Sequence, residues 1–197
     1  MSAWRTPATL TGRHVTLRPL AAEDATDLLA AGRDAGLDGM FFTNAGNLLS
    51  DPAAYVAGQL AEQAAGRGLP FVVETPAHDI VGMTRFLRMN EAHRRVEIGG
   101  TFYARSVQRT GVNTEAKYLL LTHAFDVLDC QVVQIRTDWF NKRSQAAIER
   151  LGARRDGVLR NHQVLNGRIR DIVVYSIIAG EWPGVRTNLE FMLGRAG

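Results

Sequence analysis

The chain has little of what marks secreted, membrane-spanning or metal-binding proteins. Its single cysteine, Cys130, cannot form a disulfide within the chain, and we expect a buried, inert thiol there. No run approaches the ~20 uninterrupted apolar residues that a membrane-spanning helix requires, and the first residues lack the apolar stretch of a signal peptide. The five histidines show no metal-ligand spacing with one another, so we expect no bound metal. These absences favour a cytoplasmic protein.

Lysine is almost missing as well, because only Lys117 and Lys142 are lysines among 23 basic residues. Arginine, which suits bidentate contacts to phosphate and carboxylate groups, supplies nearly all of the positive charge, although biased codon usage would give the same preference. The 20 acidic residues leave a net charge of only +3. We therefore expect a small anionic ligand at most, with no direct binding to nucleic acid or membrane.

What is present is enough for one domain with a substantial core, since 46% of the 197 residues are hydrophobic. Hydrophobic periodicity predicts a strand–helix–strand unit, in which strands at 96–102 and 132–137 run parallel on either side of a helix at 114–128. The turn Asn166-Gly167 predicts a hairpin between the last two strands. The remaining expected elements are strands at 14–20, 69–74, 80–89, 154–159 and 170–178, and helices at 23–30, 50–66, 142–151 and after 181–183.

Residues 108–113 read Gln-Arg-Thr-Gly-Val-Asn and join an apolar strand to an amphipathic helix. We expect Gly111 to let the backbone turn sharply there, so that several N–H groups point toward one place. The free amides of the first helical turn and the helix dipole favour an anion, and Arg105 and Arg109 add positive charge. The loop predicts a phosphate-binding site, although an ordinary strand-to-helix turn shares its pattern.

Several motifs in the same order point to a family. The order of elements, the loop at 108–113 and the segment Asn-Lys-Arg-Ser-Gln-Ala-Ala-Ile-Glu-Arg-Leu-Gly-Ala at 141–153 resemble the GCN5-related N-acetyltransferase (GNAT) family. The runs at 156–160, 170–177 and 181–183 resemble its branch of ribosomal-protein N-terminal acetyltransferases. That family's loop usually ends in glycine or alanine. Asn113 departs from this pattern, and we interpret it as a helix cap.

The resemblance implies an α/β (α+β) domain with a single mixed, mostly antiparallel sheet that contains a splayed parallel strand pair and is flanked by helices. We assign residues 1–197 to one domain, with a core at about 10–183 and a C-terminal helical extension at 184–197. The resemblance also implies acetyl-coenzyme A as co-substrate and leaves a homodimer open. The coenzyme-binding residues that it implies are Thr101, Phe102, Gln108, Arg109, Thr110, Gly111, Val112, Asn113, Thr114, Asn141 and Ser144.

The implied reaction is acetyl transfer to a primary amine, in which an oxyanion develops and a thiolate leaves. The resemblance places the oxyanion donor, a backbone N–H, near residues 101–103. Asn141 and Ser144 share one helix face and could reach the pantetheine arm and the sulfur, with Ser144 as a catalytic residue. The alternative is a helix-capping asparagine beside a solvent-facing serine. Water or Tyr103 would then protonate the thiolate.

Glu97 is the second expected catalytic residue. A carboxylate in an apolar strand is costly unless it is hydrated or paired, so Glu97 could face the substrate and take the amine proton through water. The alternative is an ion pair with Arg94 or Arg95 on an exposed face. A weak base would suffice for an α-amine, of which about one-fifth is neutral at pH 7.4, against about one-thousandth of a lysine.

The acceptor is therefore expected to be the α-amine of a protein or peptide N-terminus. A small-molecule amine acetyltransferase and a non-catalytic acyl-coenzyme A sensor are the alternatives, and a polyamine or aminoglycoside acceptor would favour an acidic cleft. The poorly periodic segment at 36–49, which contains Met40, Phe41 and Phe42, could line the acceptor site. His162 and Asp171 are weaker acceptor-site candidates.

Overall fold

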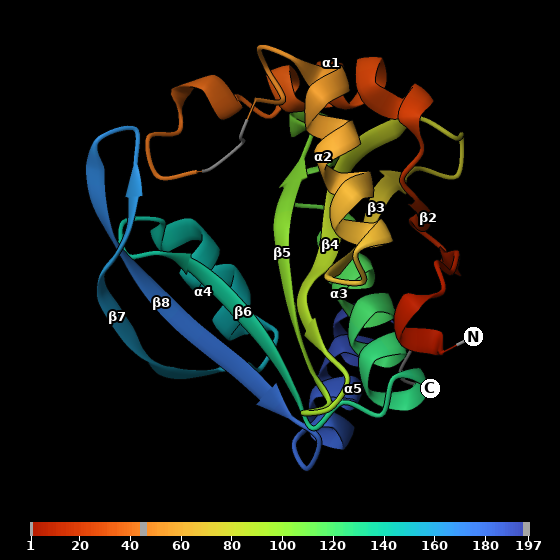
Figure 1. Cartoon of the computed structure of the whole chain (residues 1–197). Helices are drawn as coiled ribbons and strands as arrows, with labels where there is room; N and C mark the ends of the chain where they lie inside the picture. The colour runs from red at the N-terminus through yellow and green to blue at the C-terminus, as the bar shows by residue number, and fades with distance from the viewer. Residues whose placement is uncertain (1, 44–46, 195–197) are drawn as a thin grey trace.

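The fold is built on one eight-stranded sheet, seen in a computed structural model that describes residues 2–43 and 47–194 (Figure 1). The strand order is β1-β2-β3-β4-β5-β6-β8-β7, and every neighbouring pair is antiparallel except β5 and β6. The strands are β1 Leu10–Thr11, β2 Thr16–Pro19, β3 Gly68–Glu74, β4 Ile80–Asn90, β5 Arg95–Tyr103, β6 Val132–Asp138, β7 Arg154–Leu165 and β8 Arg168–Ile178.

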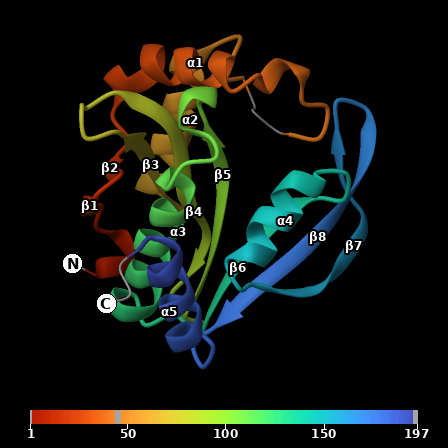
Figure 2. The ribbon, with the colours of Figure 1, turned by 180° about the vertical axis from the view of Figure 1, so that it is seen from behind.

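Five α-helices of the described residues cover the sheet. Figures 1 and 2 show α1 and α2 on one face and α3, α4 and α5 on the other. A π-helical turn, His123–Val127, continues α3. The helices are α1 Ala25–Asp34, α2 Pro52–Ala64, α3 Val112–Thr122, α4 Lys142–Arg150 and α5 Trp182–Met192. We call the two sides the α1–α2 face and the α3–α4 face.

Local signals set the bounds of α2 as the sequence predicts. The Asp51 carboxylate accepts the N–H of Ala54 at 2.9 Å, and Pro52 occupies the first helical position, where no N–H is needed. Gly66 follows the helix with a φ of 70°, a left-handed conformation that costs glycine little. The Asn166-Gly167 hairpin is also confirmed, since both residues have positive φ between β7 and β8.

The parallel strands β5 and β6 pair only over their first halves. Their register runs from Arg95 opposite Val132 to Ile98 opposite Ile135, and beyond that point the strands diverge into a V (Figures 1 and 2). Gly100, with a φ of 57°, lies in β5 just after the pairing ends. The expected mixed sheet with a splayed parallel pair is thus confirmed. Inside the V, the facing main-chain edges of β5 and β6 have no strand partner among the described residues.

Two apolar clusters pack against the two faces. The larger cluster lies under α3, α4 and α5 and takes Val96 and Ile98 from β5. The smaller one packs α1 and α2 on β3 and β4, with Met83 at its base. Since side chains alternate along a strand, Glu97 must point to the α1–α2 face.

The structure differs from the sequence-based expectation at both ends of the chain. The short strand β1 was not expected. The C-terminal helix begins at Trp182 rather than 184, and Trp182, Val185 and Leu189 join the larger core, so this helix is packed into the domain. Residues 195–197 of the expected extension lie outside the described residues.

Cys130 is buried as expected, and burial raises the pKa of its thiol to about 12, which leaves no nucleophilic thiolate at neutral pH. Within residues 2–43 and 47–194, no helix is long and apolar enough to cross a membrane.

Candidate active site

The N-terminus of α3 follows β5 through a short loop. Gly111 is the N-cap residue of the helix, and the N–H of Val112 is satisfied by the Thr110 hydroxyl at 3.3 Å. The Thr110 hydroxyl in turn donates to the Val107 carbonyl at 2.6 Å. The following first-turn amides have no partner within the helix by its own geometry and remain suited to an anion.

Two expectations about this loop are wrong in their physical reason. Gly111 has an ordinary helical conformation, φ −67°, whereas Arg109 takes the left-handed one, φ 64°. Space rather than conformation favours glycine at 111, because a Cβ there would lie 3.0 Å from the His14 ring and press on it. Asn113 is not a cap, since it is the second residue of α3 and the cap is Gly111.

Helix α4 brings two arginines to the same loop. The Arg143 guanidinium donates to the Gln108 side-chain oxygen at 2.7 Å, and the Gln108 amide donates to the Tyr103 carbonyl at 2.8 Å. Arg150 donates to the Thr114 hydroxyl at 3.2 Å. These contacts tie the end of β5, the loop and α4 together and place positive charge beside the first turn of α3.

The start of α4 faces the V from the same side. The Asn141 side chain accepts the Ser144 N–H at 3.0 Å, so Asn141 is the N-cap of the helix. Its expected contact with a pantetheine arm would come in addition to this role. Ser144 is half-buried and its hydroxyl has no protein partner among the described residues, so that hydroxyl is available to a ligand.

Residues 101–103 form the arm of β5 inside the V. Thr101 is half-buried, and its hydroxyl lies 2.8 Å from that of Thr84 on β4. Phe102 packs against the smaller core cluster. The Tyr103 hydroxyl is buried with no hydrogen-bond partner among the described residues, and burial raises its pKa, so it is a neutral O–H at physiological pH.

Behind this arm lies Lys117, which the sequence reading missed. Its ammonium nitrogen Nζ is within 3.0 Å of the Thr101 hydroxyl and 3.4 Å of the Thr84 hydroxyl. None of the ion pairs of the described residues involves Lys117. Burial lowers the pKa of Lys117 to about 7, so the group titrates near neutral pH. A charged residue within the apolar face of α3 was the available signal.

Glu97 lies at the base of the V and is 5% exposed. Its Oε2 is 2.6 Å from Arg88 Nη1 and 3.1 Å from Arg136 Nε, the latter a charge contact without hydrogen-bond alignment. Arg88 comes from β4 and Arg136 from β6, so this carboxylate joins the two arms of the V. We call these three residues the base triad.

The two partners that the sequence offered for Glu97 are not the observed ones. Arg94 pairs instead with Asp129 at 2.5 Å. Arg95, which precedes Glu97 by two residues, is exposed and makes no ion pair with a described residue. Side chains 39 residues away along the chain, as Arg136 is from Glu97, give no local pattern by which a single sequence could identify them.

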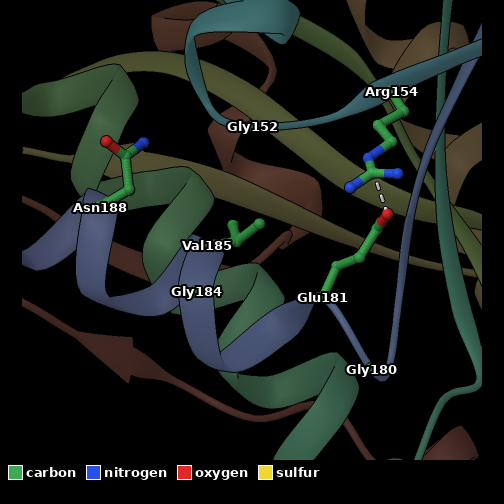
Figure 3. A pocket seen from close by; sticks show the side chains of 7 residues that line it. All are labelled: Gly152, Arg154, Gly180, Glu181, Gly184, Val185 and Asn188. Atoms are coloured by element: carbon green, nitrogen blue, oxygen red, sulfur yellow. Dashed lines mark ion pairs between the residues drawn. The ribbon is translucent and has the colours of Figure 1, made fainter.

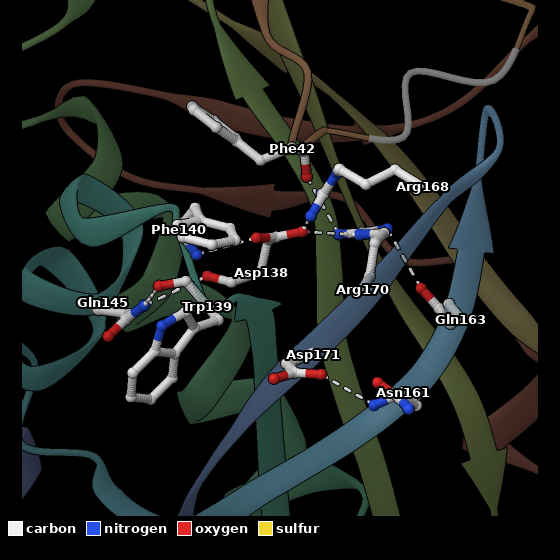
Figure 4. A network of polar contacts seen from close by, with 10 residues as sticks. All are labelled: Phe42, Asp138, Trp139, Phe140, Gln145, Asn161, Gln163, Arg168, Arg170 and Asp171. Carbon is white, nitrogen blue, oxygen red and sulfur yellow. Dashed lines mark hydrogen bonds and ion pairs between the residues drawn. The ribbon is translucent and has the colours of Figure 1, made fainter.

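A second buried carboxylate, Asp138, ends β6 at the mouth of the V and is 1% exposed. Its Oδ2 lies 2.5 Å from Arg168 Nη2 and 2.8 Å from Arg170 Nε, and its Oδ1 accepts the N–H of Phe140 at 2.9 Å (Figure 4). Burial alone would raise the pKa of Asp138, but the Phe140 N–H and the two guanidinium groups together lower it. Asp138, Arg168 and Arg170 form the mouth triad.

The mouth triad also holds the loop between α1 and α2. Arg170 Nη2 donates to the Phe42 carbonyl at 3.0 Å and Nη1 to the Gln163 side chain at 3.1 Å (Figure 4). The Arg168 guanidinium lies over the rings of Phe41 and Phe140, at 5.1 and 5.9 Å. The segment expected to line the acceptor site therefore reaches the mouth, although its residues 44–46 lie outside the described ones. Met40 packs into the smaller core cluster instead.

The two weaker acceptor-site candidates, Asp171 and His162, have different surroundings. The Asp171 carboxylate accepts the N–H of Asn161 at 2.8 Å, where β7 has an irregular register, and thus shapes the hairpin. His162 is exposed in the same irregular stretch.

Within residues 2–43 and 47–194, no group of three or more His, Cys, Asp or Glu side chains is placed to hold a metal ion.

A surface hollow between the end of α4 and the start of α5 contains none of the expected site residues. It is open, and the Arg154–Glu181 ion pair at 2.9 Å forms one wall (Figure 3). The other lining residues are Gly152, Gly180, Gly184, Val185 and Asn188. The expected residues meet instead around the V.

Comparison with known proteins agrees with this arrangement. A family model described as an acetyltransferase (GNAT) domain matches residues 14–154. Bacillus subtilis (strain 168) YdaF, described provisionally as a ribosomal N-acetyltransferase, is 32% identical over 105 residues, which are 53% of this chain and 57% of YdaF. The chain thus spans less than two thirds of the length of this curated relative.

Two solved structures are similar over nearly the whole chain. One is a GCN5-related N-acetyltransferase from Brucella melitensis, with 26% identity and a TM-score of 0.84 over 95% of this chain and 86% of the other. The second is Mycobacterium smegmatis RimJ in complex with CoA-disulfide, with 24% identity and a TM-score of 0.82 over 97% of each chain. The latter likeness is one of fold.

Proposed function

The chain belongs to the GNAT acetyltransferase family, and on this premise we propose that it transfers an acetyl group from acetyl-coenzyme A to a primary amine. We propose as acceptor the α-amine of a protein or peptide N-terminus, attacked directly in a ternary complex. The ribosomal description of YdaF supports a protein acceptor. The observation that carries the proposal is the V between β5 and β6, with the α3 N-terminus on one side of it and the base triad on the other.

Acetyl-coenzyme A is expected on the α3–α4 face. Its phosphates would meet the first-turn amides of α3, with Arg143 and Arg150 adding charge, and residues 108–114 are the proposed contacts. Its extended pantetheine arm has amides that can bond the unpaired main chain of β5 inside the V. The loop is built for this fit, because Gly111 keeps the turn free of a side chain.

The chain's own groups can serve each stage of the transfer. A main-chain N–H of residues 101–103 on the edge of β5 that faces the V would supply a donor fixed in place for the oxyanion. The Ser144 hydroxyl is our candidate donor to the departing sulfur, and the neutral Tyr103 hydroxyl is the alternative. Both come from the walls of the V, so either would act without a large movement.

Proton removal remains assigned to Glu97, through a water molecule. Glu97 is already engaged by Arg88 and Arg136, so it would reach the amine only through that water. The site therefore suits an amine that arrives largely neutral. An α-amine with a pKa near 8 meets this condition far better than a lysine near 10.4, which is why we favour a terminal amine.

Binding is tested with acetyl-coenzyme A and a thermal shift. A ligand bound only by the folded protein raises the melting temperature in a dose-dependent way. Gly111→Val, which would press a side chain on the His14 ring at the loop, should abolish the shift, while Gly184→Ala, in open space on α5, should keep it. Normal binding by Gly111→Val would place the phosphates elsewhere.

Turnover is tested by mass spectrometry of N-terminal peptides, lysine-containing peptides with blocked termini, and small amines after incubation with acetyl-coenzyme A. Acetylation of free α-amines supports the proposal. Acetylation of small amines alone makes the protein a small-molecule acetyltransferase. Binding without any turnover makes it an acyl-coenzyme A sensor.

A further inference from the structure

The α1–α2 face of the V is rich in arginine. Alternation along β6 places Arg136 and Asp138 on this face, because Val133 and Ile135, at the alternate positions of the strand, belong to the opposite core. The two triads together contain four guanidinium groups and two carboxylates. Two positive charges thus remain in excess on the face where an acceptor would approach.

The arginines differ in how many of their donors are used. Arg170 bonds Asp138, Gln163 and the Phe42 carbonyl, so its fork is occupied by the protein itself. Arg168 gives only Nη2 to Asp138, and its Nε is buried with no partner among the described residues. Arg88 likewise gives only Nη1, to Glu97. Spare donors on a guanidinium group that is held in place, as that of Arg168 is, suit a further carboxylate.

Position along β6 separates the mouth triad, with the spare donors of Arg168, from the base of the V. Glu97 is in register with Gln134, and Asp138 lies four residues further on, about 13 Å along β6 at ~3.3 Å per residue. That span corresponds to a few residues of an extended peptide. Thr101 likewise lies four residues beyond Glu97 along β5, so an amine held near Thr101 would face the mouth triad across the V, and the following residues of its peptide would pass close to that triad.

We propose that this face selects acidic N-terminal peptides, which carry a carboxylate close behind the reacting amine. Arg168 binds that carboxylate, and Arg136 and Arg88 add to the positive electrostatic potential around it. The inference rests on the proposed function and adds its substrate class. Arg168 is held for the task by Asp138 and by the rings of Phe41 and Phe140, which leave 27% of its side chain exposed. A polyamine would meet charge of its own sign.

The test compares matched hexapeptides that begin with alanine and carry aspartate, asparagine or lysine at the second, third or fourth position. At one of these positions we expect aspartate to raise kcat/KM about fivefold over asparagine, the size of a partly exposed ion pair, and lysine to lower it. The preference should shrink in high salt. Equal rates for aspartate and asparagine at every position, or a preference for lysine, overturn the inference.

Arg168→Gln should bring the aspartate preference close to one, and Arg168→Lys, which keeps a charge beside Asp138, should keep part of it. Arg186→Gln is the matched control. Arg186 also pairs with an aspartate, Asp126, lies over a ring, Trp182, at 4.8 Å and has a buried Nε without a partner among the described residues, but it sits on α5. A preference that survives Arg168→Gln overturns the assignment to Arg168.

A binding readout separates this inference from the proposed function. With coenzyme A present, the aspartate peptide should raise the melting temperature more than the asparagine peptide. A protein that binds in this order but acetylates nothing contradicts the proposed function and leaves the inference standing. Acetylation of both peptides at one rate does the reverse, and faster acetylation of spermidine than of any peptide overturns both.

Discussion

The base triad and the mouth triad use the same chemistry, a buried carboxylate between two arginines, but join different parts of the molecule. Glu97 links β4 and β6, so it holds the two arms of the V at the point where they separate. Asp138 links β6 to β8 and, through Arg170, to the loop between α1 and α2. On the proposed function, the base triad would fix the geometry of the reaction, whereas the mouth triad would shape the entrance for the acceptor.

The triads also differ in exposure, and this decides what each contributes to stability. At the mouth, Arg170 has 9% and Arg168 27% of the side chain exposed, whereas at the base Arg136 has 20% and Arg88 47% exposed. A guanidinium group that can turn to water loses little when its partner is removed, but a confined one loses much. The mouth triad should thus carry more folding energy and the base triad more of the chemistry.

The largest effect is expected for Asp138→Asn. The substitution keeps the shape but leaves two confined guanidinium groups without a counter-charge, which should lower the free energy of unfolding by about 3 to 5 kcal/mol. Urea unfolding at pH 7 measures this. Glu97→Gln should cost clearly less, and an equal or larger loss for Glu97→Gln would contradict the comparison.

Repeating the urea unfolding at acid pH tests the direction of the pH dependence that Asp138 causes. The pKa of Asp138 is lowered in the folded protein, so its contribution is present above the unfolded pKa, near 3.9, and is lost as pH falls through the folded pKa. Unfolding of Asp138→Asn should therefore depend less on pH below about 4 than unfolding of the parent protein does.

The sequence predicted the elements that create the V but not the contacts across it. The parallel pair, the crossover helix and the Asn166-Gly167 hairpin come from local periodicity and turn residues, which one sequence contains. Arg170 and Phe42 lie 128 residues apart, and their contact follows from tertiary packing. The candidate coenzyme loop could be found for the same local reason, whereas the acceptor side could not.

Helix α3 shows the same limit within a single element. Its start is predicted at 114 but lies at Val112, so Asn113 falls inside the helix and not at its cap. The sequence analysis assigns no role to its charged residues, yet the Glu115 carboxylate accepts the backbone N–H groups of Arg13, His14 and Val15 and ties α3 to the turn before β2. Buried charge can be suspected from an apolar helix face, but its partners cannot be named.

Lys117 extends the comparison of the two triads, because it is a buried basic group that bonds two hydroxyls instead of a carboxylate. Its pKa is about 7 when folded and about 10.5 when unfolded, so between these values the unfolded chain binds a proton that the folded chain does not. The free energy of unfolding should rise with pH across this window, by up to several kcal/mol at about 1.4 per pKa unit.

Lys117→Met should remove that rise, so that the variant gains most over the parent protein at pH 6 and least at pH 10. Chemical denaturation at several pH values measures the difference. Lys142→Met, on the exposed start of α4, is the control and should leave the pH dependence unchanged. A parent protein whose stability is flat from pH 7 to 10 would show that Lys117 stays charged.

At the base, Glu97→Gln should lower kcat/KM for an α-amine about 100-fold at pH 7, the size of a general-base contribution. The rate should recover as pH rises and the amine loses its proton unaided, whereas a loss that is equal at every pH would indicate positioning of Arg88 and Arg136 instead. The control is Glu62→Gln, whose carboxylate pairs with Arg67 on the surface. Melting temperatures identify any variant that is merely unfolded.

The smallest effect is expected at the aromatic side of the mouth. The rings of Phe41 and Phe140 lie 6.2 Å apart and are 61% and 58% exposed, so they bridge the α1–α2 loop and the end of β6 without filling a core. Phe41→Ala removes one ring and frees Arg168 on one side, which should raise KM for a peptide acceptor about threefold to tenfold, the worth of an aromatic pair. The melting temperature and the affinity for acetyl-coenzyme A should hardly change, because neither depends on this bridge.

Phe191→Ala, which removes a 73% exposed ring from α5, controls for the loss of exposed apolar surface and should leave KM unchanged. A fall in kcat with KM constant would place Phe41 in the chemistry at the base, and the division between base and mouth would not hold.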